Sequence, residues 1–208
     1  MGKLLRPTIS EKLIGIGDSH LDNFTFFCAA SCRIPGATSY GLTKPNSDTN
    51  AREAFLSFLS SFPSHIPLLC IGEVDCNSLP WRTITTKAPE DFIYQSITSL
   101  FSFIKETNRR FILPSVTLPP VDSFKELGIR KFVTSNKVER SSLVKLYNSL
   151  LLKNAYDNGH IYLDITTPTT GPNGLVDEYF IHSSSDVHLQ PHKLYPIVLD
   201  LLSEISYV

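Results

Sequence analysis

The sequence predicts an α/β fold: a three-layer α/β/α, flavodoxin-like arrangement with about five parallel strands. Short apolar runs bounded by glycine or proline alternate with longer segments of helical pattern, which is typical of a parallel sheet covered on both faces. The length of 208 residues suits one α/β domain with a substantial core. No internal repeat, low-complexity tract or linker interrupts the pattern, so we expect residues 1–208 to form a single domain.

The elements of the first half follow from the apolar runs and their breaks. A run that stops at a glycine predicts a strand at 13–17, and a segment without glycine or proline predicts a helix at 21–30. A short second strand is expected within 29–35. A helix at 51–61 then leads, past two prolines, to a third strand at 66–72.

The second half continues the alternation. A proline and two acids begin a long helix at 89–107, as helix N-termini favour. A strand at 110–114, a helix at 141–157, a strand at 160–165 and a closing helix at 193–205 complete the expected set. Ligands of open parallel sheets bind beyond the carboxyl ends of the strands, so that edge is where site residues are expected.

The composition excludes several classes of function. A formal net charge of −1 gives no electrostatic basis for binding nucleic acid or an anionic membrane. No apolar stretch reaches the ~20 residues that span a bilayer, and the N-terminus lacks the apolar core of a signal peptide. We therefore expect a cytoplasmic protein with no nucleic-acid or membrane partner, and the sequence predicts no particular oligomeric state.

Four cysteines occur without the spacing of a metal or redox motif. Cys28 and Cys32 would share one face of the expected first helix, and Cys70 lies inside an apolar strand. Free thiols are the expected state of these residues and of Cys76 in a reducing compartment. Neither a metal nor an organic cofactor is predicted.

The first candidate for chemistry is Ser19, which follows the first expected strand. A serine on a strand-to-helix turn lies at the carboxyl edge of the sheet, where unpaired N–H groups favour a developing anion. The alternative is a serine that merely caps the helix. Three other polar segments are expected at the same edge, at 34–39, 72–75 and 183–188.

A serine nucleophile needs a base within hydrogen-bond reach and a third group that orients the base. His188 fits this role, because Asp186 lies two residues before it in a polar loop at the expected edge. Without Ser19, the same pair would be interpreted as a loop aspartate and histidine in solvent.

The remaining histidines fit the role of the base less well. His65 and His160 precede strands and so lie at the opposite edge, and His182 and His192 lack an adjacent carboxylate. His20 is the neighbour of the candidate nucleophile, but it would point elsewhere on a helical turn. We expect it to lie behind the nucleophile or on the surface.

Four segments resemble the sequence blocks of the SGNH (GDSL-type) hydrolases. Residues 17–19, Gly-Asp-Ser, resemble the first block, which implies that Ser19 is the nucleophile. Residues 34–42 resemble the second block, whose glycine gives a backbone N–H to the oxyanion; that glycine is Gly36. Residues 69–75 resemble the third block and residues 186–188 the last. The resemblance implies an SGNH-hydrolase-like fold over nearly the whole chain.

Two departures from the family pattern concern the oxyanion hole and the acid. Val74 stands where the third block carries an oxyanion-binding Asn, so a backbone N–H, Asn77 or another donor would have to compensate. One residue rather than two separates Asp186 from His188, and Ser185 stands where the family carries Asp. The variant motifs Gly-Glu-Val-Asp-Cys and Asp-x-His-Leu resemble a sub-branch associated with polysaccharide-related gene clusters.

The segment after the third expected strand has several interpretations. Glu73 and Asp75 could form a glycosidase pair or a Mg²⁺ site, but we expect one of them to accept N–H bonds that brace the Ser19 loop. Trp81 could stack on a sugar ring or act as a hydrophobic lid over the sheet. Arg82 could bind a carboxylate or a phosphate.

These observations predict a serine esterase that hydrolyses an acyl group, most plausibly an O-acetyl ester on a carbohydrate. Ser19, His188 and Asp186 would be catalytic, and the oxyanion hole would comprise Ser19, Gly36 and Asn77. The substrate would be a small-molecule or carbohydrate ester. Two alternatives are an O-acyltransferase of polysaccharide assembly and a catalytically weak carbohydrate-binding or scaffold protein of the same fold.

Overall fold

The computed structural model describes residues 12–81, 88–122, 135–183 and 186–205. Its centre is a parallel sheet of five strands in the order β2-β1-β3-β4-β5, which is the order of flavodoxin-like folds. The strands are β1 (Leu13–Gly17), β2 (Ala30–Arg33), β3 (Ile66–Cys70), β4 (Ile112–Pro114) and β5 (Ile161–Leu163).

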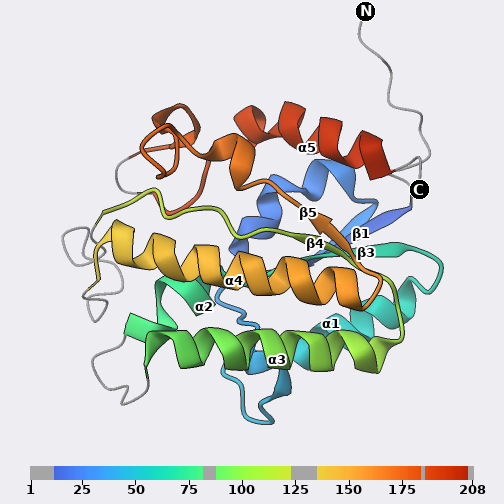
Figure 1. Ribbon diagram of the computed structural model, residues 1–208. Coiled ribbons are helices and arrows are strands. Elements are labelled where there is room, and N and C mark those ends of the chain that lie inside the picture. The colour runs from blue at the N-terminus through green and yellow to red at the C-terminus, as the bar shows by residue number, and fades with distance from the viewer. Residues whose placement is uncertain (1–11, 82–87, 123–134, 184–185, 206–208) are drawn as a thin grey trace, which may run out of the picture.

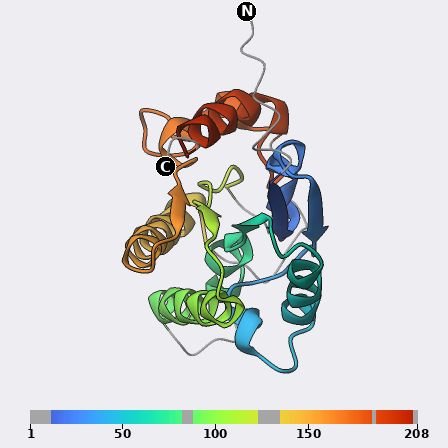
Figure 2. The same ribbon diagram turned by 90° about the vertical axis from the view of Figure 1, so that its right-hand side faces the viewer.

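Helices cover both faces of this sheet. The α-helices are α1 (Ala51–Ser61), α2 (Glu73–Asn77), α3 (Pro89–Thr107), α4 (Lys137–Asp157) and α5 (Pro191–Ile205). The short 3₁₀-helices are η1 (Ser19–Asn23), η2 (Thr25–Phe27), η3 (Tyr40–Thr43), η4 (Leu79–Trp81), η5 (Thr167–Thr169) and η6 (Glu178–Phe180). Helix α5 lies on one face with η1 and η2, and α1, α3 and α4 lie on the other (Figures 1 and 2). The predicted three-layer α/β/α fold is confirmed.

The central strands are buried on both faces. Every residue of β1 is buried, and Leu13, Ile14 and Ile16 are at most 1% exposed. Strands covered by helices on both sides are apolar along their whole length instead of alternating with polar residues. This explains why an uninterrupted apolar run predicted β1 with its correct bounds.

The predicted helix at 21–30 is wrong. The segment forms η1 and η2 and then enters β2, so Cys28 ends a 3₁₀-helix and Cys32 lies in a strand. The connection must return from the end of β1 to the start of β2, and a 3₁₀-helix covers about 2.0 Å per residue against about 1.5 Å in an α-helix. The cysteines therefore do not share a helix face, although all four are free thiols.

Other differences lie at the ends of elements. Helix α4 begins four residues before the predicted 141–157, because Asn136 and Glu139 form a capping box at its N-terminus. Helix α5 begins at Pro191, where proline is favoured as a first helical residue. The sequence missed α2, a single short helix directly after β3. Within the described ranges, none of the helices combines the length and apolar character needed to span a membrane.

Candidate active site

The candidate nucleophile lies on a tight turn at the end of β1. Gly17 leaves no room for a side chain there, since a Cβ atom would lie 2.0 Å from the carbonyl oxygen of Cys70. The N–H of Asp18 donates to that same carbonyl at 3.0 Å, and the Asp18 carboxylate accepts the backbone N–H of His20 at 2.8 Å. The Asp18 side chain thus caps η1 and fixes the turn on which the half-buried Ser19 projects.

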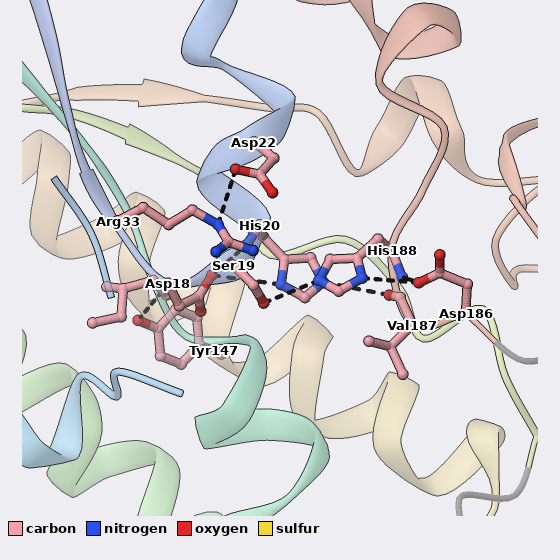
Figure 3. A network of polar contacts seen from close by, with 10 residues as sticks. Asp18, Ser19, His20, Asp22, Arg33, Tyr147, Asp186, Val187 and His188 are labelled. Carbon is pink, nitrogen blue, oxygen red and sulfur yellow. Dashed lines mark hydrogen bonds and ion pairs between the residues drawn. The ribbon is translucent and has the colours of Figure 1, made fainter. Parts of the chain in front are cut away.

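The three predicted catalytic residues form one chain of hydrogen bonds (Figure 3). The Nε2 atom of His188 lies 3.0 Å from the Oγ atom of Ser19. The Nδ1 atom of the same ring lies 2.8 Å from Asp186 Oδ1. Two segments 169 residues apart therefore bring a hydroxyl, an imidazole and a carboxylate into the order that nucleophilic catalysis requires.

A backbone hydrogen bond holds Asp186 against His188 although only one residue separates them. Asp186 Oδ1 also accepts the backbone N–H of His188 at 2.9 Å, so the carboxylate folds back over its own loop. Burial, the largest influence, would raise the pKa of Asp186. The hydrogen bonds from the backbone and ring of His188 outweigh it and lower that pKa. His182 adds to this effect, with Nδ1 3.6 Å from Asp186 Oδ2, so the expectation that His182 lacks a carboxylate is wrong.

The loop after β2 presents a second free amide at the same edge. Ile34 donates its N–H to the carbonyl of Gly17 at 2.8 Å, which places the loop beside the nucleophile turn. Pro35 and Gly36 are the central residues of a turn closed by Ala37 N–H to Ile34 O at 3.1 Å, and the φ angle of Gly36 is +78°. A proline followed by glycine at positive φ is typical of a type II turn. Within the described residues, the N–H groups of Ser19 and Gly36 have no acceptor.

Asp75 fixes the loop that carries Gly36. Its carboxylate is fully buried and accepts the N–H groups of Ser39 at 2.8 Å and Tyr40 at 2.9 Å, and the hydroxyl of Ser96 at 2.7 Å. Burial raises the pKa of Asp75 to about 6, although these hydrogen bonds oppose the shift. An acid was expected to brace the Ser19 loop. For Asp75 that expectation is wrong, because this acid braces the Gly36 loop.

Tyr147 completes this support from α4. Its hydroxyl lies 2.7 Å from Ser39 Oγ and donates to the carbonyl of Ile71 at 3.4 Å. The ring packs against Gly72, where a Cβ atom would lie 2.6 Å from it. Sequence reasoning missed Tyr147, because a buried tyrosine in a helix carries no pattern that distinguishes it from an ordinary core residue.

Comparisons with known proteins support the fold. No family model matches the chain, and no curated protein matches it. Among solved structures, a GDSL-like lipase from Bacteroides thetaiotaomicron aligns with a TM-score of 0.58 and 17% identity over 93% of this chain and 86% of that one. A protein assigned to the SGNH hydrolases, from Slackia heliotrinireducens, aligns with a TM-score of 0.52 and 14% identity over 92% and 96%. The chain has the SGNH-hydrolase fold.

A third structure, the acetyl xylan esterase AlAXEase, aligns with a TM-score of 0.52 and 13% identity over 94% of this chain and 99% of that one. The fold that the four sequence blocks implied is confirmed, whereas the match of the blocks themselves stays a resemblance. In the order of the sheet, the first, second and third blocks follow β1, β2 and β3, which are neighbours. Their ends therefore meet at one edge.

His20 lies behind the nucleophile turn, which is the first of its two expected positions. It is only 7% exposed, so it is not a surface residue, and its ring lies against the ring of His188 with 4.6 Å between centroids. With Asp18, Glu73 and Cys70 it lines a cavity of about 20 Å³ behind the nucleophile turn. That volume suits about one water molecule, so any larger molecule has to approach Ser19 from the solvent side.

The third block shows a clear departure from the SGNH pattern. Val74 lies inside α2 and carries no donor in its side chain. Asn77 is the last residue of the same helix and is 2% exposed. In the described part of the chain, no hydrogen bond joins Asn77 to Ser19 or Gly36, so its role in the oxyanion hole stays a prediction.

Trp81 lies beside the loop of the candidate base. Its indole N–H donates to the carbonyl of Cys76 at 2.9 Å, and its side chain packs against Val121, as does Val187. Trp81 thus shares one apolar cluster with Val187, the residue that precedes His188. Arg82, the second predicted substrate-binding residue, lies outside the described residues.

Proposed function

We propose that the protein is a serine esterase that hydrolyses an acyl ester, with Ser19 as nucleophile, His188 as general base and acid, and Asp186 as the group that orients His188. The observation that carries the proposal is the chain of contacts from Asp186 Oδ1 through both ring nitrogens of His188 to Ser19 Oγ, at 2.8 and 3.0 Å. The SGNH-hydrolase fold supports it, since lipases and esterases share that fold.

Every proton transfer in the reaction uses the same atom, Nε2 of His188. Ser19 Oγ attacks the ester carbonyl and its proton passes to Nε2 of His188, which then protonates the leaving alcohol. Water attacks the resulting acyl-enzyme and gives a proton to Nε2, which returns it to Ser19 as the acid leaves. Asp186 stays ionised throughout, because its lowered pKa disfavours taking up the proton.

The oxyanion of each tetrahedral intermediate would accept the N–H groups of Ser19 and Gly36. Both amides are free of other acceptors among the described residues. Asp75 and Tyr147 hold the Gly36 loop in place before substrate arrives, which is the condition for electrostatic stabilisation without reorganisation. A third donor from a side chain would come from Asn77 or from the substrate itself, since Val74 cannot donate.

The proposed substrate class is an O-acetyl ester on a carbohydrate. Trp81 presents a partly exposed aromatic ring, held by its bond to the Cys76 carbonyl, in the same Val121 cluster as Val187 of the His188 loop, and we expect a sugar ring to stack on it. The similarity to an acetyl xylan esterase in fold is in keeping with this class.

The test compares wild type with Ser19→Ala and with Ser142→Ala, a control at an exposed serine of α4. Hydrolysis of p-nitrophenyl acetate and of acetylated sugars should fall by about 10⁴-fold or more in Ser19→Ala and stay unchanged in the control. A fluorophosphonate probe should label wild type and Ser142→Ala only. Undiminished hydrolysis by Ser19→Ala would refute the proposal, and acyl transfer to a sugar hydroxyl without release to water would make the protein a transferase.

A further inference from the structure

His20 is a buried imidazole that the proposed reaction does not use. Its Nδ1 atom lies 3.5 Å from Asp18 Oδ1, and its Nε2 atom lies 3.4 Å from the carbonyl oxygen of Val187. A carboxylate and a carbonyl can only accept hydrogen bonds, whereas a neutral imidazole has one N–H. The contact with Asp18 is an ion pair, and the ring forms it and also donates to Val187 only when both of its nitrogens carry protons.

The charged groups around His20 favour this doubly protonated ring. Asp18 faces it from the end of β1 and Glu73 from α2, while the Cys70 thiol of β3 lines the same cavity. Burial, the largest influence, lowers the pKa of His20, but the hydrogen bond and charge of Asp18 and the charge of Glu73 outweigh it and raise that pKa to about 9. Burial also raises the pKa of the Cys70 thiol well above its ordinary value, so the thiol stays neutral.

The two contacts of His20 on its outer side both involve the loop of the base. Val187 is the single residue between Asp186 and His188, and its carbonyl faces His20 Nε2. The rings of His20 and His188 lie against each other at an interplanar angle of 32° (Figure 3). His20 thus touches the backbone between the acid and the base as well as the face of the base itself.

We propose that His20, anchored by Asp18, is a positioning residue of the esterase: it holds the Val187 carbonyl and the ring face of His188 so that Asp186 and Ser19 each meet one nitrogen of His188. The proposal rests on the proposed function. It also explains how the short loop is held. Only one residue separates the acid from the base, and the contact of His20 with that residue fixes its backbone.

The protonation state of His20 then controls the geometry of the site. When the ring loses a proton, one remaining N–H has to serve both the Asp18 carboxylate and the Val187 carbonyl. The contact with Val187 is the weaker of the two, because the competing acceptor carries a full charge. Deprotonation of His20 therefore releases the loop of His188, and activity declines as pH rises through about 9.

The experiment measures kcat and KM for p-nitrophenyl acetate across the neutral and alkaline range, corrected for spontaneous hydrolysis. Three variants are compared with wild type: His20→Phe, Asp18→Asn and, as a control, His192→Phe at an exposed histidine of α5. His20→Phe keeps a flat ring against His188 but removes both nitrogens. Asp18→Asn keeps a side-chain oxygen that can accept the backbone N–H of His20 and so cap η1, and it removes only the charge.

In wild type and the control, kcat should decline above about pH 9. In His20→Phe, kcat should be lower by about tenfold to a hundredfold at neutral pH, with KM changed by no more than about twofold, and the decline near pH 9 should be absent. In Asp18→Asn the decline should begin at lower pH, since loss of the carboxylate lowers the pKa of His20.

A His20→Phe enzyme with wild-type kcat and an unchanged alkaline decline would overturn the proposal. If His20→Phe fails to fold, Asp18→Asn decides alone, and an alkaline decline at the wild-type pH in that variant overturns it. The proposed function is judged separately: an active Ser19→Ala refutes the esterase itself, whereas an inactive Ser19→Ala with a fully active His20→Phe refutes only the role of His20.

Discussion

The two edges of the sheet both carry histidines and charged side chains, but they use them differently. The amino edge has the larger hollow, about 350 Å³, lined by Lys105, Arg109, Arg110 and His160. At the carboxyl edge, the cavity behind the nucleophile turn measures about 20 Å³. On size and charge alone, the amino edge would be the more attractive place for a ligand.

Hydrogen-bond partners reverse that ranking. At the amino edge, the Arg109 guanidinium donates to the carbonyls of Leu59, Phe62 and His65, and His160 Nδ1 accepts the backbone N–H of Phe111 at 3.4 Å. These groups satisfy the backbone at chain turns and helix ends. At the carboxyl edge the partners are side chains that can exchange protons with one another. The partners of a histidine therefore locate chemistry better than the volume of a nearby hollow.

The largest difference between the two edges is expected when one histidine is removed from each. His188→Ala should lower kcat/KM by about 10⁴-fold or more, because the nucleophile loses its base. His160→Ala removes an imidazole that accepts a backbone N–H and packs near Phe101 and Phe111 at the opposite edge, and it should leave kcat/KM unchanged. Ester hydrolysis by both purified variants is the measurement. A comparable loss in both would show that the two edges do not differ as described.

A second prediction concerns the buried carboxylate of the carboxyl edge. The pKa of Asp75 in the folded protein, about 6, lies above its ordinary value of 3.8. Its contribution to stability is therefore present below the ordinary value and is lost as pH rises through about 6. The excess free energy of unfolding of wild type over Asp75→Asn should fall by about 2 kcal/mol between about pH 4 and about pH 7.

Urea unfolding of the two proteins at both pH values checks this. The pH dependence of the difference is the readout, because an asparagine amide also alters the contacts with Ser39 and Tyr40 at every pH. A difference that is independent of pH would mean that Asp75 is not desolvated as its burial indicates.

The smallest expected effect tests the support of the Gly36 loop from α4. Tyr147→Phe removes the hydroxyl that lies 2.7 Å from Ser39 Oγ and should lower the free energy of unfolding by about 1 kcal/mol. Tyr156→Phe is the matched control, since Tyr156 lies on the same helix and is 84% exposed. Chemical denaturation of both variants measures the effect, and equal stabilities would contradict the role given to Tyr147.

Much of the fold could be predicted because local patterns agree with the tertiary structure. The strand at 13–17 and the helices at 51–61 and 89–107 have the predicted bounds, since burial on both faces or a clear N-terminus marks them. The prediction of a helix at 21–30 failed because the distance between β1 and β2 decides the conformation of this segment, and its own composition does not. Helix α2 was missed because five residues are too few to show a period.

The sequence by itself determined the alternation of strands and helices and the identity of Ser19, Gly36 and His188 as candidates, because these depend on residue types at fixed positions. Only the tertiary structure decided that Asp186 reaches His188 across a single residue, and that His20 lies against the base and not on the surface. Those contacts depend on how loops from distant parts of the chain meet at the carboxyl edge. No sequence pattern within a single segment predicts which loops come together there.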